Sequence, residues 1–181
     1  LKILPGEAKV ITIKRKKDQW QGLEVLGVPE DFDTIEQELL SLEADRKAKI
    51  AQLAEGIEPD LINIGIDEWR AIKEHVDCAT NIIRDEITLS REAGHRYVLM
   101  AQGRQVKTWG LKDESDLTEC FTTLFMGKFA IEEAQRYYNH NQMIPDSSKA
   151  NVIETLEKVG NRAAWISASF GEFPALIPNL V

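Results

Sequence analysis

Apolar residues occur along this chain in two patterns: short continuous runs, and longer stripes that repeat with helical spacing. The run Leu61-Ile-Asn-Ile-Gly-Ile66 is rich in isoleucine and follows Glu58-Pro59-Asp60. This pattern is typical of a strand buried on both faces of a parallel sheet. Similar runs predict further strands near residues 8–14, 97–101 and 121–126.

The helical stripes lie mostly between these runs. The first begins at Asp33, where Glu36 follows three residues later in a capping-box arrangement, and continues to about Leu53 with Arg46 filling a gap. A second long helix is predicted after the run at 61–66, with its apolar stripe from Ile72 to Ile87 and Gly94 as the residue after its end. Shorter helices are predicted near residues 130–138 and 151–159.

Strands that alternate mostly with helices indicate right-handed crossovers. We therefore predict an α/β fold with a mainly parallel sheet and helices on both of its faces. The stretch from Arg162 to Pro178 predicts an antiparallel β-hairpin that would add to one edge of this sheet. The whole chain, 1–181, is expected to form a single α/β domain.

Composition changes this picture little. The chain has 181 residues, of which 43% are hydrophobic and 29% charged, as is ordinary for a soluble globular protein. No apolar run approaches the roughly 18 to 20 residues that span a bilayer, and the N-terminus lacks a signal-peptide pattern. Cys78 and Cys120 have no metal-type spacing and are expected to be reduced, which favours a cytoplasmic location.

The net charge of −8 argues against a surface that is basic all over, but a local stripe of cations is enough to bind DNA. The basic run from Lys14 to Lys17, together with Arg104 and Lys107, is the candidate for such a contact. The alternative is that this run is a solvated strand end.

The most informative polar residues are Asp67 and Glu68, which directly follow the run at 61–66. Ligands of open α/β sheets bind at the carboxyl ends of the strands, where two acids would hold Mg²⁺ and orient a water molecule. Gln102 closes the next predicted strand, so it would converge with the acids if the two strands are neighbours. The simpler alternative is that Asp67 caps the following helix.

Other kinds of site find less support in the sequence. None of the three histidines (His75, His95 and His140) indicates a metal site or a catalytic triad. A hydrolase or transferase using the two acids as acid and base would lack both a nucleophile elbow and a histidine partner.

The order of these features resembles the motor domain of the FtsK/HerA group of hexameric DNA-pumping ATPases, which also resembles conjugative coupling proteins. Residues 61–68 resemble its Walker B strand, and 81–102 resemble its basic helix end followed by an apolar strand ending in Gln. The chain departs from the family pattern at Met100-Ala101 and in the loop that follows. The segments 116–127 and 162–180 resemble the remaining strand and the closing hairpin.

The resemblance implies a RecA-like P-loop fold that uses ATP and Mg²⁺ in a hexameric ring moving along DNA. Asp67 would bind Mg²⁺, Glu68 would polarise the attacking water, and Gln102 would sense the γ-phosphate. Arg91 is the candidate finger reaching into a neighbouring subunit's site. Competing cations for this last role are Arg84, Arg96 and Arg104.

The sequence contains no Gly-x-x-x-x-Gly-Lys-[Ser/Thr] loop, which would hold the β- and γ-phosphates. We therefore expect either the C-terminal portion of a longer motor, which the opening at Leu1 favours, or a degenerate relative. In both cases the chain alone should not turn over ATP. A non-catalytic α/β interaction module is the alternative function.

Overall fold

The computed structural model describes residues 5–14, 20, 22–101, 120–141 and 143–178. We expected one domain, whereas the chain divides into two compact units, Leu1–Leu117 (unit 1) and Thr118–Val181 (unit 2). The two units are described separately below.

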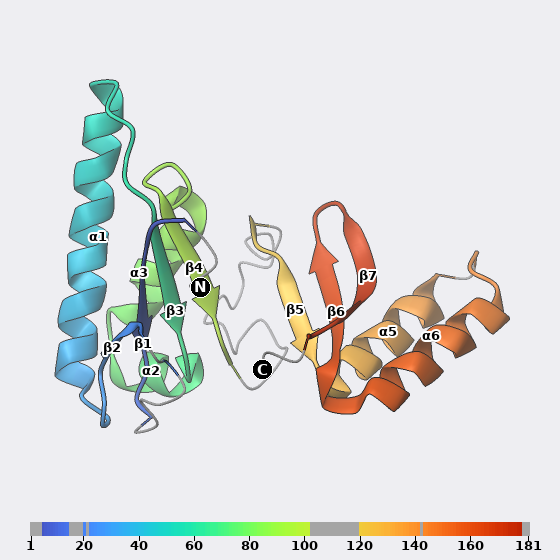
Figure 1. The fold of residues 1–181 in the computed structure, drawn as a ribbon. Helices are drawn as coiled ribbons and strands as arrows, with labels where there is room; N and C mark the ends of the chain where they lie inside the picture. Colours follow the sequence, from blue (N-terminus) through green and yellow to red (C-terminus); the bar gives the residue numbers. More distant parts are fainter. Residues whose placement is uncertain (1–4, 15–19, 21, 102–119, 142, 179–181) are drawn as a thin grey trace. The chain divides into compact units, whose positions relative to one another are not determined.

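The described part of unit 1 contains a four-stranded parallel sheet with the strand order β2-β1-β3-β4 (Figure 1). The parallel α/β architecture is thus confirmed. The strands are β1 (Glu7–Ile11), β2 (Glu24–Leu26), β3 (Ile62–Ile66) and β4 (His95–Leu99). Strand β2 was not predicted, because its three residues lie between the glycines and proline of an irregular stretch.

Three described helices belong to unit 1: α1 (Phe32–Ala54), α2 (Trp69–His75) and α3 (Ala79–Leu89). Helix α1 matches its prediction except at its start. The N-cap is Asp31 and not Asp33, because the Asp31 carboxylate accepts a hydrogen bond from the Thr34 backbone N–H at 3.0 Å.

The prediction of helices on both faces of this sheet was wrong for the described helices. A single buried cluster joins residues of α1, α2 and α3 to Ile11, Ile64 and Ile66, alternate residues that lie on one face of β1 and β3. The strand order explains this arrangement. The crossovers from β2 to β3 and from β3 to β4 advance in the same direction across the sheet, and right-handed crossovers that do so stay on one face.

The second predicted helix is broken in two. The stripe of Ile72, Val76 and Ile83 is buried throughout, but Val76 adopts an extended conformation (φ −116°, ψ 103°) that ends α2. Helix α3 ends at Leu89, so Gly94 does not directly follow it. Gly94 has φ +73°, and a Cβ there would lie 2.8 Å from the Asp60 carbonyl oxygen, so close packing of two chain segments requires the glycine.

Unit 2 contains a separate antiparallel sheet of β5 (Thr123–Met126), β6 (Ala163–Ala168) and β7 (Gly171–Leu176) in its described residues. The predicted hairpin is confirmed as β6 and β7, but its placement on the edge of the parallel sheet was wrong. Strand β5 was also misplaced there. It pairs antiparallel with β6, which sets Phe125 opposite Trp165.

Helices α5 (Lys128–His140) and α6 (Asp146–Val159) pack against this second sheet. The core of unit 2 centres on the buried Trp165, whose ring lies 5.4 Å from that of Tyr137 and 5.8 Å from that of Tyr138, centroid to centroid. These aromatic contacts join α5 to β6 within the core of unit 2. Among the described residues, no helix is both long and apolar enough to cross a membrane.

Candidate functional site

Asp67 and Glu68 lie at the carboxyl end of β3, between the ends of β1 and β4. The Asp67 backbone N–H donates to the Ile11 carbonyl at 2.9 Å, which continues the β1–β3 ladder by one residue. On the other side, the Trp69 N–H donates to the Met100 carbonyl at 3.1 Å. The two acids therefore stand where the sequence analysis placed them, beside two neighbouring strand ends.

The backbone at Glu68 has a left-handed conformation, with φ 56° and ψ 38°. This conformation costs a residue with a Cβ about 1–2 kcal/mol, and such outliers gather at functional sites. The next residue, Trp69, fixes this backbone conformation, because its side chain is fully buried in the core of unit 1. Glu68 occupies the N-cap position of α2, and no side-chain cap bond is seen there in the described structure, so the capping role considered for Asp67 was wrong.

The Asp67 side chain instead contacts the end of β1. The Thr12 hydroxyl lies 3.2 Å from Asp67 Oδ2 and donates to it, and the Lys14 backbone N–H lies 3.2 Å from Thr12 Oγ1. Lys14 Nζ lies 3.7 Å from Asp67 Oδ2 and forms an ion pair with Glu68 Oε1. We call Thr12, Lys14, Asp67 and Glu68 the strand-end cluster.

The strand-end cluster lies at the surface, and its charges are only partly balanced. The side chains of Lys14, Asp67 and Glu68 are 43%, 14% and 22% exposed. The pKa of Lys14 is raised, first by its hydrogen bond to Glu68 and further by the charge of Asp67, against an opposing effect of partial burial. Among the described residues, two carboxylates share one ammonium, so these four side chains together carry a net negative charge.

Several predicted site residues lie elsewhere. Gln102, Arg104 and Lys107 fall outside the described residues, as does Arg15–Lys17. Arg91 is exposed in the turn before β4. Because β3 and β4 are parallel, with Ile62 opposite His95, this turn lies at the other end of the sheet from Asp67. Arg91 therefore does not join the acids of its own chain.

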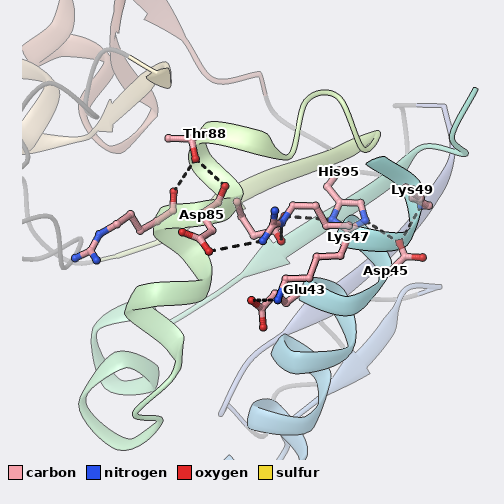
Figure 2. A network of polar contacts seen from close by, with 10 residues as sticks. Glu43, Asp45, Lys47, Lys49, Asp85, Thr88 and His95 are labelled. Carbon is pink, nitrogen blue, oxygen red and sulfur yellow. Dashed lines mark hydrogen bonds and ion pairs between the residues drawn. The ribbon is translucent and has the colours of Figure 1, made fainter. Parts of the chain in front are cut away.

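A second charged cluster, which we call the buried network, was missed by the sequence analysis (Figure 2). Arg46 Nε lies 2.7 Å from Glu86 Oε1. Each ring nitrogen of His95 faces a carboxylate oxygen: Nδ1 lies 3.2 Å from Glu86 Oε2, and Nε2 lies 2.8 Å from Asp45 Oδ2. The one available signal was Arg46 within an apolar stripe, because a buried arginine needs an anionic partner.

Asp67 and Glu68 of the strand-end cluster carry carboxylate oxygens, the kind of ligand that Mg²⁺ takes from proteins. No group of three or more His, Cys, Asp and Glu residues suited to a metal occurs in the described part of the chain. Magnesium bound with a nucleotide needs no such group, because phosphates and water supply most of its ligands and the protein one or two carboxylates. Asp67 and Glu68 would provide these, with Lys14 displaced.

The chain matches no protein-family model, and neither the curated proteins nor the solved structures contain a significant match to it.

Proposed function

We propose that this chain supplies the acidic half of the Mg²⁺–ATP site of an FtsK/HerA-like motor with a RecA-like core. The observation that carries the proposal is the position of Asp67 and Glu68, adjacent and partly exposed at the carboxyl end of an inner strand of a parallel sheet. Ligands bind at this edge in open α/β sheets, because helix starts and free strand ends meet there.

The two acids have different surroundings, which suits two different roles. Asp67 is the less exposed and is fixed by the Thr12 hydroxyl, as a metal-holding carboxylate should be. Glu68 projects from a left-handed backbone position and is more exposed, which suits a group that orients the attacking water. Bound Mg²⁺ would offset the negative charge of the phosphates. Gln102 is proposed as the γ-phosphate sensor.

The phosphate cradle is not assigned to any residue of this chain, since the sequence has no P-loop. Hydrolysis is therefore proposed for a full-length protein in which this chain would act together with a P-loop that lies outside it. The expected thiol state of Cys78 and Cys120, which are both free in the structure, fits a cytoplasmic enzyme.

The test is a Glu68→Gln variant of the full-length protein. We expect hydrolysis to fall by about 10²-fold or more while Mg²⁺–ATP binding is retained, because the amide keeps the shape but cannot orient water as a carboxylate does. Glu74→Gln, which alters an exposed carboxylate paired with Arg70 on α2, is the matched control. Unchanged turnover in the Glu68 variant would remove Glu68 from this role.

The ring can be tested through Arg91. If Arg91 acts in a neighbouring subunit, Arg91→Ala and Glu68→Gln proteins should each be inactive, but mixing them should restore part of the hydrolysis. Mixed rings would contain some sites with both residues intact, each from a different subunit. Failure of mixing to restore activity, with rings shown to exchange subunits, would exclude the trans role.

DNA binding forms a separate part of the proposal and rests on the basic run from Lys14 to Lys17 with Arg104 and Lys107. We expect the affinity for duplex DNA to fall steeply as salt is added, because cations that neutralise phosphates release counterions. Absence of binding at low salt would contradict it.

A non-catalytic interaction module is the second candidate, and one contact favours it. Lys14 pairs with both acids, which is also the arrangement of a purely structural ion pair. Isothermal titration of the full-length protein with Mg²⁺–ATP separates the two functions, since a structural module should show no binding.

A further inference from the structure

Among the residues that the structure describes, the cation paired with the two proposed metal ligands is the Lys14 side chain. Lys14 Nζ pairs with Glu68 Oε1 and lies 3.7 Å from Asp67 Oδ2. These oxygens are the ones that a divalent ion would use. A bound ion and the Lys14 ammonium would repel each other at such short range, so the two cannot occupy the cluster together.

Lys14 is fixed at its backbone, whereas its ammonium end is held by the same two carboxylates that the metal would need. Its N–H donates to Thr12 Oγ1, which fixes the residue just beyond β1. The side chain is 43% exposed, so the flexible four-carbon stem can turn toward solvent without opening the core. Lys9, which lies within β1, differs, because it pairs with Glu38 and its side chain is only 21% exposed.

A bound nucleotide would change which groups are available to pair with the Lys14 ammonium. The phosphates of a metal–nucleotide complex bring several negative charges to the strand ends together with the metal. An ammonium that loses its carboxylate partners to the metal would then find new partners in the phosphate oxygens, to which lysine binds as a point charge. A metal ion arriving alone would offer Lys14 no such replacement.

We propose that Lys14 is an internal cation that competes with free divalent metal for Asp67 and Glu68 and moves to the phosphates when a metal–nucleotide complex binds. Lys14 is thereby a specificity residue: it weakens binding of the metal alone and strengthens binding of the complex. The inference rests on the proposed function, since it assigns a role at the same site.

The experiment compares wild-type full-length protein with Lys14→Met, which keeps most of the stem and removes the charge. Mn²⁺ alone is titrated and followed by the loss of its free electron paramagnetic resonance signal, and Mg²⁺–ATP is titrated by calorimetry. We expect Lys14→Met to bind Mn²⁺ about three- to fivefold more tightly and Mg²⁺–ATP about three- to fivefold more weakly, the scale of one partly exposed charge contact.

Two further variants control for general charge effects. Lys9→Met removes a positive charge from β1, the strand that precedes Lys14, and should change neither affinity appreciably. Lys14→Arg keeps the charge and should retain the weak Mn²⁺ binding of the wild type. If Lys14→Met binds Mn²⁺ no more tightly than the wild type does, or if Lys9→Met has the same effect, the competition is excluded.

The outcomes separate this inference from the proposed function. Tighter Mn²⁺ binding by Lys14→Met, without Mg²⁺–ATP binding by any variant, would support the competition with free metal but contradict both the transfer to phosphates and the ATPase function. Mg²⁺–ATP binding that is equal in the wild type and Lys14→Met would support the nucleotide site and contradict the role of Lys14.

Discussion

Unit 1 holds two charged clusters that are built in opposite ways. The buried network joins α1, α3 and β4 through Arg46, Glu86 and His95, whose side chains are at most 4% exposed. The strand-end cluster lies at the surface, where Lys14 is 43% exposed and Glu68 has a strained backbone. The first pairs Arg46 with Glu86 inside the core, and in the second, within the described residues, two carboxylates share one cation.

The difference separates a stabilising role from a binding role. A buried ion pair must be complete, because each charge loses its hydration and any unpaired member is costly. A partly exposed cluster can exchange its partners at little cost, since water takes up each charge as it is released. Only the strand-end cluster has the freedom that ligand binding needs.

The largest effect is expected from Glu86→Gln in the buried network. The amide leaves Arg46 without a buried counter-charge, so the free energy of unfolding should fall by about 3–5 kcal/mol. The loss of free energy is measured by urea unfolding of unit 1, with hydrogen exchange of the β3 amides as the probe. A loss similar to that of a surface mutation would mean that water reaches the network.

A smaller effect is expected from Asp45→Asn, at the exposed edge of the same network. Partial burial acts to raise the pKa of Asp45, but hydrogen bonds from His95 and Lys49 outweigh it, so the pKa lies below the ordinary 3.8. The stabilisation is therefore present above that value and is lost as the pH falls through the lower, folded-state pKa.

Wild type should accordingly be more stable than Asp45→Asn at neutral pH, by about 1 kcal/mol or less. The gap should close as the pH drops below about 4, where the unfolded carboxyl also becomes protonated. Urea midpoints measured from pH 7 down to pH 3 check the sign. A gap that widens on acidification would contradict the assigned ionisation.

The strand-end cluster should respond in the other direction. Glu68→Gly should change the free energy of unfolding by less than about 1 kcal/mol, toward higher stability, because relief of the left-handed strain offsets the lost ion pair with Lys14. The same urea experiment measures it. Destabilisation on the scale of Glu86→Gln would show that the two clusters are not different in kind.

The smallest effect is expected from Glu74→Gln on α2. Its carboxylate pairs with Arg70 one helical turn away at 3.0 Å, and both side chains are mostly exposed. We expect no measurable change in the urea midpoint, because water solvates both charges once the pair is lost. This variant sets the baseline for the other three.

Local patterns were enough to predict much of unit 1. The isoleucine-rich run predicted β3 and the position of Asp67 and Glu68 after it, and the long stripe predicted α1 almost to its ends. These features depend on neighbours a few residues apart. The break between α2 and α3 was missed because the apolar stripe continues through it, with Val76 buried like its helical neighbours.

Features that depend on distant partners could not be predicted. Strand β5 has the composition of a sheet strand, but no local signal tells that Phe125 faces Trp165 across an antiparallel pair. The partner of His95 at Asp45 lies 50 residues away. Lys14 was considered as a DNA contact or a solvated residue, and its pairing with Asp67 and Glu68 became visible only when β1 and β3 were placed side by side.

The position of Trp69 gives the strand-end cluster an optical reporter. Its indole is fully buried and belongs to the residue next to Glu68. The emission energy of a shielded indole shifts with nearby charge. Exchange of the Lys14 ammonium for a divalent ion at Glu68 should therefore shift the emission wavelength of Trp69. With Trp20, Trp109 and Trp165 replaced by Phe, fluorescence would follow occupancy of the strand ends in real time.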